Sequence, residues 1–165
     1  MSRTPVSGIL RAGGLWKKPG RGAPACGLEQ SMSADTSVGR LEDVAVLIVD
    51  DDQDVRESFE AAMLAEGAEV ESCDNGNDAV DICASDDPPE LVILDMMLPG
   101  RSGFLALEKI KGRESSPVVI MVTANEGKRH QEYGEALGVD AYLIKPVPLG
   151  ALVSVAAELM AARKA

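Results

Sequence analysis

Residues 46–54 read VLIVDDDQD: four apolar residues lead directly into three consecutive aspartates, and a fourth aspartate follows two places later. The apolar run has the length and composition of a buried β-strand. Two carboxylates about 4 Å apart repel each other by roughly 4 kcal/mol at the effective dielectric constant of a protein surface. So much negative charge at the end of a buried strand indicates that a positively charged group binds there.

Further runs of strand length follow along the chain. Counting the first, the apolar or β-branched runs are residues 44–49, 68–73, 91–94, 118–123 and 141–144. Segments of helix length separate or follow them, at residues 53–66, 77–84, 103–111, 126–137 and 149–164. In the first of these segments, Val55, Phe59, Ala62 and Met63 share one helix face, and Gly67 supplies a C-terminal cap.

Strand and helix thus alternate five times. Nearly continuous apolar strands indicate burial on both faces, which is typical of a parallel sheet covered by helices and joined by right-handed crossovers. We therefore predict an α/β domain built on a doubly wound, five-stranded parallel sheet. In such sheets the functional residues gather beyond the carboxyl ends of the strands.

The predicted strand ends carry polar residues that belong to one kind of chemistry. These residues are Asp50, Asp51, Asp52, Asp95, Thr123 and Lys145. Each alone is a common loop residue, but together they place acids, a hydroxyl and an ammonium at one edge. Clustered carboxylates suit Mg²⁺, and an aspartate beside Mg²⁺ can act as a nucleophile on phosphorus to form an aspartyl phosphate. A lysine and a hydroxyl can stabilise the phosphoryl oxygens.

Four motifs resemble those of the receiver domains of two-component response regulators, in the single-domain form typified by the chemotaxis regulator. The motifs are VLIVDDD, VILDMMLPGRSG, VIMVTAN and YLIKP. The intervals are also similar to the family's: 44 residues from Asp51 to Asp95, 28 to Thr123 and 22 to Lys145. The resemblance covers about residues 44–164 and implies a flavodoxin-like fold with strand order 2-1-3-4-5 and five helices.

The resemblance implies a phosphorylation site with a bound metal ion. Asp95 would be the phosphoacceptor, which receives its phosphoryl group from a phosphohistidine on a sensor histidine kinase or phosphotransfer protein. Asp51 and Asp95 would bind Mg²⁺ through their carboxylates, Met97 through its main-chain carbonyl, and Asp50 mainly through coordinated water. The protein would then be a phosphoacceptor rather than an enzyme. Self-dephosphorylation is expected to be slow at most, because the Met97 thioether is a poor hydrogen-bond partner for the attacking water.

The resemblance also implies a switch. Lys145 would contact a phosphoryl oxygen, and the bond between Lys145 and Pro146 is usually cis in the family. Thr123 would be the switch hydroxyl and Tyr142 the coupled aromatic, with a readout face formed by the fourth helix, fifth strand and fifth helix. Only twenty residues follow Lys145, so we expect output by contact with an unidentified protein target. A phosphorelay intermediate, which passes the phosphoryl group on, is the alternative.

Two other functions fit the aspartates less well. A calcium-binding EF-hand loop starting at Asp50 would need Gly where Val55 stands and Glu where Ala61 stands. A haloacid-dehalogenase-type phosphatase would need Thr or Val two residues after its second Asp, where this chain has Asp54 or Arg56. The phosphatase therefore remains a distant alternative.

The remaining conspicuous residues have simpler interpretations. His130, the only histidine, lies in a charged segment and is predicted to be solvated. Cys73 and Cys83 are predicted to pack as small apolar residues, and Ser102 to cap a helix. Asp52 is expected to lie favourably near the amino end of the first helix.

Charge divides the chain into two parts. Residues 1–40 hold six Lys or Arg against two acids, whereas residues 41–165 hold ten against twenty-five. We predict a disordered basic tail over residues 1–41 and a receiver domain over residues 42–165. Because Met32 begins a short polar approach to the first strand, it is a candidate for the true start of translation.

The composition also bears on location and partners. Three cysteines without CxxC spacing favour a reducing cytoplasm. The sequence has no run of 18 apolar residues, which predicts no membrane span. A strongly acidic domain predicts no direct binding to nucleic acid.

Overall fold

The computed structural model describes residues 39–124 and 127–164. Its five strands form one sheet in the order β2-β1-β3-β4-β5, and every pair of neighbours is parallel. The strands are β1 (Ala45–Val49), β2 (Glu69–Cys73), β3 (Leu91–Asp95), β4 (Val118–Thr123) and β5 (Ala141–Ile144). The predicted doubly wound parallel sheet and its strand order are confirmed.

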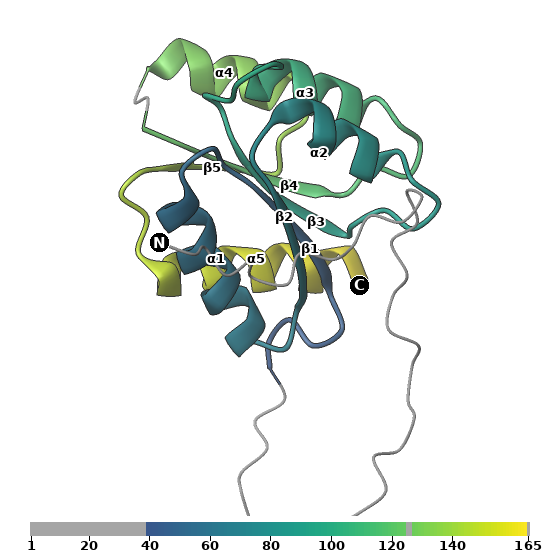
Figure 1. Ribbon diagram of the computed structural model, residues 1–165, viewed down its shortest axis with the longest axis vertical. Helices are drawn as coiled ribbons and strands as arrows, with labels where there is room; N and C mark the ends of the chain where they lie inside the picture. Colours follow the sequence, from purple (N-terminus) through teal and green to yellow (C-terminus); the bar gives the residue numbers. More distant parts are fainter. Residues whose placement is uncertain (1–38, 125–126, 165) are drawn as a thin grey trace, which may run out of the picture.

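Five helices cover the sheet as two layers (Figure 1). They are α1 (Gln53–Ala65), α2 (Gly76–Cys83), α3 (Gly103–Lys111), α4 (Lys128–Ala136) and α5 (Leu149–Lys164). Helices α1 and α5 lie on one face, and α2, α3 and α4 lie on the other. The expected start of the fourth helix at residue 126 lies outside the described residues.

The core consists of two apolar clusters, one on each face of the sheet. Alternating residues of β1 serve both, because Val46 and Ile48 pack beneath α1 and α5 while Leu47 and Val49 pack beneath α2 and α3. Every residue of β1, β3 and β4 is buried, as continuous apolar runs predict. The outer strands β2 and β5 are mostly half-buried, since each has a neighbouring strand on one side only.

The packed chain begins ahead of β1. Leu41 is fully buried in the core beneath α1 and α5. Arg40 forms an ion pair with Glu66 at 3.2 Å and donates a hydrogen bond to Ser154 on α5. The boundary drawn between residues 41 and 42 from composition therefore falls within a packed segment, and residues 1–38 of the predicted tail lie outside the described residues.

The predicted packing of the cysteines and the predicted helix caps are confirmed. Cys83 is buried and Cys73 half-buried, and burial raises the pKa of each thiol to about 12. The Ser102 hydroxyl accepts a hydrogen bond from the main-chain N–H of Leu105 at 3.4 Å, which caps α3. Gly67 has φ of +85° just after α1, as expected of a C-terminal glycine.

The prediction for His130 was wrong. Its ring is half-buried and stacks on Phe104 of α3, with 6.0 Å between ring centroids and an interplanar angle of 13°. Tyr133 meets the same Phe104 ring edge-on. The error arose because the charged sequence around His130 does not reveal that this side of α4 packs against α3.

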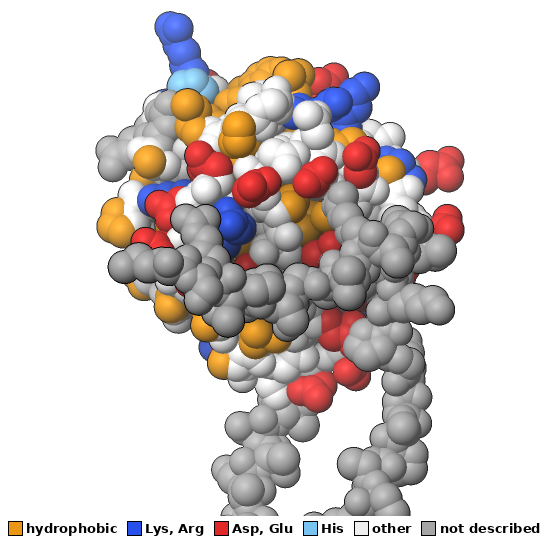
Figure 2. Space-filling model, viewed as in Figure 1, with side chains coloured by type: hydrophobic (Ala, Val, Ile, Leu, Met, Phe, Trp, Pro, Cys, Tyr) orange, Lys and Arg blue, Asp and Glu red, His pale blue; other side chains and the backbone are white. Residues whose placement is uncertain are grey.

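The surface is consistent with the acidic composition. Acidic side chains are spread over the face shown in Figure 2. No helix within residues 39–124 and 127–164 is long and apolar enough to cross a membrane.

Candidate functional site

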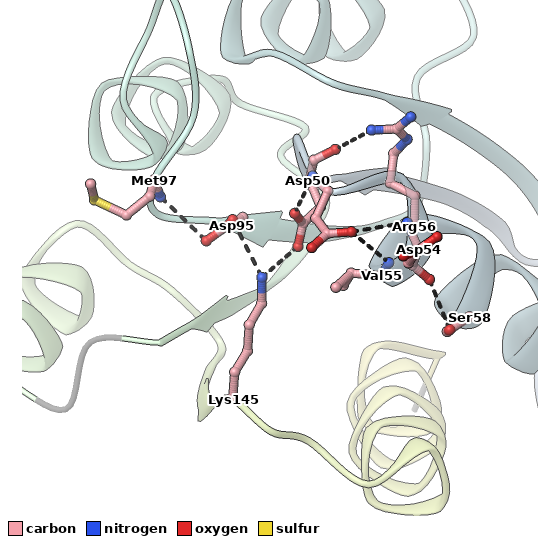
Figure 3. Close-up of polar contacts among 9 residues, drawn as sticks. Asp50, Asp54, Val55, Arg56, Ser58, Asp95, Met97 and Lys145 are labelled. Carbon is pink, nitrogen blue, oxygen red and sulfur yellow. Dashed lines mark hydrogen bonds and ion pairs between the residues drawn. The ribbon is translucent and has the colours of Figure 1, made fainter.

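The parallel sheet brings the polar residues at the strand ends to one edge. In the strand register, Asp95 of β3 lies beside Val122, so Thr123 is one residue further along β4. Thr123 in turn lies beside Ile144, which is followed by Lys145. Figure 3 shows Lys145 reaching from the end of β5 toward Asp95 and Asp50.

Of Asp50, Asp51 and Asp95, Asp50 has the most hydrogen bonds and ion pairs to the rest of the described chain. It is only 2% exposed, and its Oδ2 lies 2.6 Å from the Lys145 ammonium. Its Oδ1 accepts a hydrogen bond from the main-chain N–H of Asp52 at 3.0 Å. Its main-chain carbonyl accepts a bond from Arg56 Nη1 at 2.7 Å. Both its side chain and its backbone are therefore held in place.

Asp52 has a separate task. Its carboxylate accepts hydrogen bonds from the main-chain N–H groups of Asp54 at 2.9 Å and Val55 at 3.3 Å. Asp52 is thus the N-cap of α1, where a negative charge also interacts favourably with the helix dipole. This confirms the expected location of Asp52 and separates it from the site.

Asp95 is buried at the carboxyl end of β3, with 6% of its surface exposed. Its Oδ2 lies 3.4 Å from Lys145 Nζ, and its Oδ1 accepts a bond from the main-chain N–H of Met97 at 3.2 Å. Burial raises the pKa of Asp95 above its ordinary value, and the neighbouring Asp50 carboxylate raises it further. Lys145 and the Met97 N–H oppose this shift without cancelling it.

Lys145 is the cation nearest to both buried carboxylates among the described residues. Burial alone would lower its pKa, but the hydrogen bond to Asp50 and the charges of Asp95 and Asp50 raise that pKa above its ordinary value. Its main-chain N–H donates to the carbonyl of Thr123 at 2.8 Å. The bond from Lys145 to Pro146 is cis, as the resemblance implies.

Three carboxylates could hold a divalent cation. Asp50, Asp51 and Asp95 each offer an oxygen, and these oxygens all lie within 4.8 Å of one another. Hard oxygen donors that leave room for water suit Mg²⁺. Among the described residues, three acids face the Lys145 ammonium and the nearby Arg56 guanidinium, so negative charge is left for a cation to neutralise. The residues present therefore fit the metal that the resemblance implies.

The structure also places the other predicted residues. Thr123 is fully buried at the end of β4. Tyr142 is half-buried on β5 and packs against the core beneath α2 and α3, and this burial raises its pKa. The Met97 side chain is 68% exposed, so it points away from the core next to the phosphoacceptor candidate.

One residue near the site was missed by the sequence analysis. In the sequence Arg56 stands out only as a mismatch to the phosphatase motif, yet in the structure it contacts the backbone of Asp50. The available signal was its place in the first turns of a helix that directly follows the aspartates. A lone arginine on a predicted helix is usually solvated, which is why the signal is weak.

A groove opens beside the site. Its volume is about 570 Å³, and it lies between α1 and the segment that follows β5. Val55, Phe59, Val147 and Leu149 give it a largely apolar lining, and Lys145 reaches it from the site.

Comparison with known families identifies this arrangement. Residues 46–157 match the family model described as the response regulator receiver domain. This chain belongs to the receiver domain family. Response regulators, the proteins that contain such domains, act in two-component systems. Receiver domains in these systems accept phosphoryl groups and interact with histidine kinases or phosphotransfer proteins.

Solved receiver domains have the same fold. A CheY-like receiver domain protein from Methanospirillum hungatei is 27% identical, with a TM-score of 0.71 over 74% of this chain and 98% of that one. NtrX from Brucella abortus is 26% identical, with a TM-score of 0.67 over 73% of this chain and 28% of that one. CheY4 of Vibrio cholerae, at 23% identity and a TM-score of 0.65, covers 71% of this chain and 98% of its own, and shows the fold alone.

Proposed function

We propose that this receiver domain accepts a phosphoryl group on Asp95 from the phosphohistidine of a sensor kinase or phosphotransfer protein. The observation that carries the proposal is the position of the Asp95 carboxylate. It lies at the carboxyl end of β3, next to Asp50 and Asp51, with Lys145 Nζ at 3.4 Å from Oδ2. A nucleophilic carboxylate, two further acids and a lysine are the parts that metal-assisted phosphoryl transfer to aspartate requires.

Asp51, Asp95 and the Met97 main-chain carbonyl would hold Mg²⁺, with Asp50 acting mainly through a coordinated water. The ion would supply positive charge to the phosphoryl oxygens during transfer and afterwards. Asp50 would keep its place through Lys145 and the Asp52 N–H. The resident residues thus orient the ligands before an ion arrives.

Lys145 and Thr123 would share the oxygens of the phosphoryl group. Lys145 already contacts the acceptor carboxylate, so a small movement would bring its ammonium to a phosphoryl oxygen. A phosphoryl group adds about −1.5 to −2 charge and strong acceptors, which would draw the Thr123 hydroxyl toward β3. Tyr142, on the neighbouring strand, would then move inward.

The readout surface would be formed by α4, β5 and α5. Three large apolar side chains are exposed there: Tyr133 at 50%, Ile144 at 39% and Leu149 at 42%. These side chains would supply apolar contacts to a protein partner. The domain would signal by changing its affinity for a protein target, or act as a phosphorelay intermediate that passes the phosphoryl group on.

The deciding experiment is incubation with Mg²⁺ and acetyl phosphate, followed by intact-mass measurement and peptide mapping. The wild-type protein should gain one phosphoryl group on Asp95. Asp95→Asn should remain folded and gain none, while Asp54→Asn, a nearby exposed acid, should behave as wild type. Phosphorylation of Asp95→Asn at an unchanged level, or continuous turnover of acetyl phosphate without accumulation on the protein, would contradict the proposal.

A further inference from the structure

Arg56 holds the backbone of the acidic loop. Its Nη1 donates to the main-chain carbonyl of Asp50 at 2.7 Å, from the first turns of α1 (Figure 3). The Asp50 carbonyl belongs to the peptide unit that joins Asp50 to Asp51. Because a peptide unit is planar and trans, holding its carbonyl oxygen also fixes the direction of the Asp51 N–H.

Asp51 depends on this backbone more than Asp50 does. The Asp50 carboxylate is buried and bonded at both oxygens, to Lys145 and to the Asp52 N–H. The Asp51 side chain is exposed and makes no hydrogen bond or ion pair within residues 39–124 and 127–164. Its position is therefore set by the main chain on either side of it, which is held by Arg56 before it and by the Asp52 N–H after it.

We propose that Arg56 is a positioning residue for Mg²⁺ binding, which acts by fixing the peptide unit between the two metal-binding aspartates. The inference rests on the proposed function, because it assigns Arg56 a role toward the metal proposed there. Arg56 itself touches neither the ion nor the phosphoryl group. It acts through the backbone, by orienting the Asp51 residue that would bind the ion.

The sign of the effect separates this role from a purely electrostatic one. A positive charge close to a cation site repels the cation, so removal of Arg56 by charge alone should strengthen Mg²⁺ binding. Loss of positioning should weaken it. A role confined to the stability of α1 would lower the melting temperature and leave the Mg²⁺ affinity unchanged.

The test is a Mg²⁺ titration of the full chain, in which the ¹H–¹⁵N NMR shifts of the loop amides report binding. Melting temperatures are measured in parallel. Arg56→Met keeps the length of the side chain but removes the donor and the charge. Arg163→Met is the matched control. Arg163 also donates to main-chain carbonyls, those of Glu90 at 3.4 Å and Ser116 at 3.1 Å. These two residues precede β3 and β4, so the contacts lie at the amino ends of the strands, away from the site.

Arg56→Met is expected to weaken Mg²⁺ binding by about tenfold, the lower end of the usual cost of losing a group that orients a metal ligand. Arg163→Met should bind as wild type, and Arg56→Lys, which restores one N–H donor, should recover most of the affinity. Unchanged or tighter binding in Arg56→Met would overturn the inference. If Arg56→Met does not fold, Arg56→Gln, whose shorter side chain does not reach the Asp50 carbonyl, decides: it must bind more weakly than Arg56→Lys and Arg163→Met, or the inference fails.

Failure of the proposed function has a different signature. In that case the wild-type protein itself would show no saturable Mg²⁺ binding that Asp51→Asn removes, and both proposals would fall. If wild type binds and Asp51→Asn does not, the proposed metal site stands, and only the behaviour of the Arg56 variants bears on the inference.

Discussion

The Lys145 ammonium lies 2.6 Å from Asp50 Oδ2. Asp50 follows the carboxyl end of β1 and Lys145 follows that of β5, so the ion pair spans β3 and β4, which lie between them in the sheet. The same ammonium is 3.4 Å from Asp95. One cation thus compensates two buried carboxylates.

Removal of this cation should be costly. Lys145→Met leaves Asp50 and Asp95 buried without a counter-charge, and breaking a buried ion pair in this way costs about 3 kcal/mol. We expect the free energy of unfolding in urea at pH 7 to fall by that amount. Lys109→Met, which removes an exposed lysine of α3, is the control and should change little. Equal losses in the two variants would show that Lys145 does not compensate the buried carboxylates.

Asp95 should make folding less favourable at neutral pH than at low pH. Its pKa is raised in the folded state, so the folded protein binds more protons than the unfolded chain between the ordinary Asp pKa of about 3.9 and the raised value. Stability associated with Asp95 therefore falls as pH rises through that window. Asp95→Asn should be more stable than wild type at pH 7, with the difference shrinking toward pH 4. Urea denaturation at both pH values tests this, and a difference that grows on acidification would contradict it.

Mg²⁺ should stabilise the folded protein. An ion that binds only the folded state at ten times its dissociation constant adds about 1.4 kcal/mol to the free energy of unfolding. We expect this gain in wild type when MgCl₂ is compared with NaCl at matched ionic strength. Asp51→Asn should lose most of the gain, whereas Asp86→Asn, an exposed acid outside the site, should keep it. A gain that survives in Asp51→Asn would show that the ion binds elsewhere.

Asp52 should matter for stability rather than for phosphorylation. Asp52→Ala removes the N-cap of α1 and should cost about 1 kcal/mol. Asp52→Asn keeps a capping oxygen and should cost much less. Both variants should still accept a phosphoryl group on Asp95 from acetyl phosphate. Loss of phosphorylation in Asp52→Asn would place Asp52 in the site instead.

Met97 should slow the loss of the phosphoryl group. Its side chain is exposed beside Asp95 and offers water only a weakly accepting thioether. Met97→Asn, which introduces an amide able to orient water, should shorten the lifetime of the acyl phosphate. The rate of phosphate release after removal of the donor measures this. An equal or longer lifetime in Met97→Asn would contradict the expectation.

The sequence was most informative about the residues at strand ends. The sequence predicts that four of these residues lie close together: Asp50, Asp95, Thr123 and Lys145. The prediction needs only parallel strands in the right order, because the carboxyl ends of such strands lie side by side. The bond between Lys145 and Asp50 could not be predicted in the same way, since either Asp50 or Asp95 lies within reach of the lysine. Its preference depends on side-chain conformations that the motif does not encode.

Contacts made by helix faces were the least predictable. Arg56 and His130 both lie among charged residues. The sequence predicts that His130 is solvated and indicates no contact for Arg56. In the folded chain Arg56 turns back to the loop before its helix, and His130 stacks on Phe104 of α3. Both contacts depend on how a helix is rotated on the sheet, which follows from packing of the whole domain rather than from any local pattern.

The packed segment before β1 offers a practical point of attachment. Arg40 and Leu41 hold the chain against α1 and α5 at the amino ends of the strands, the pole of the domain opposite Asp95. A fluorophore or surface tether introduced at the next residue, the exposed Glu42, would therefore leave the end of the sheet that carries Asp95 and the groove beside it open. Donor proteins could then be assayed on an immobilised domain that presents a single, uniform orientation.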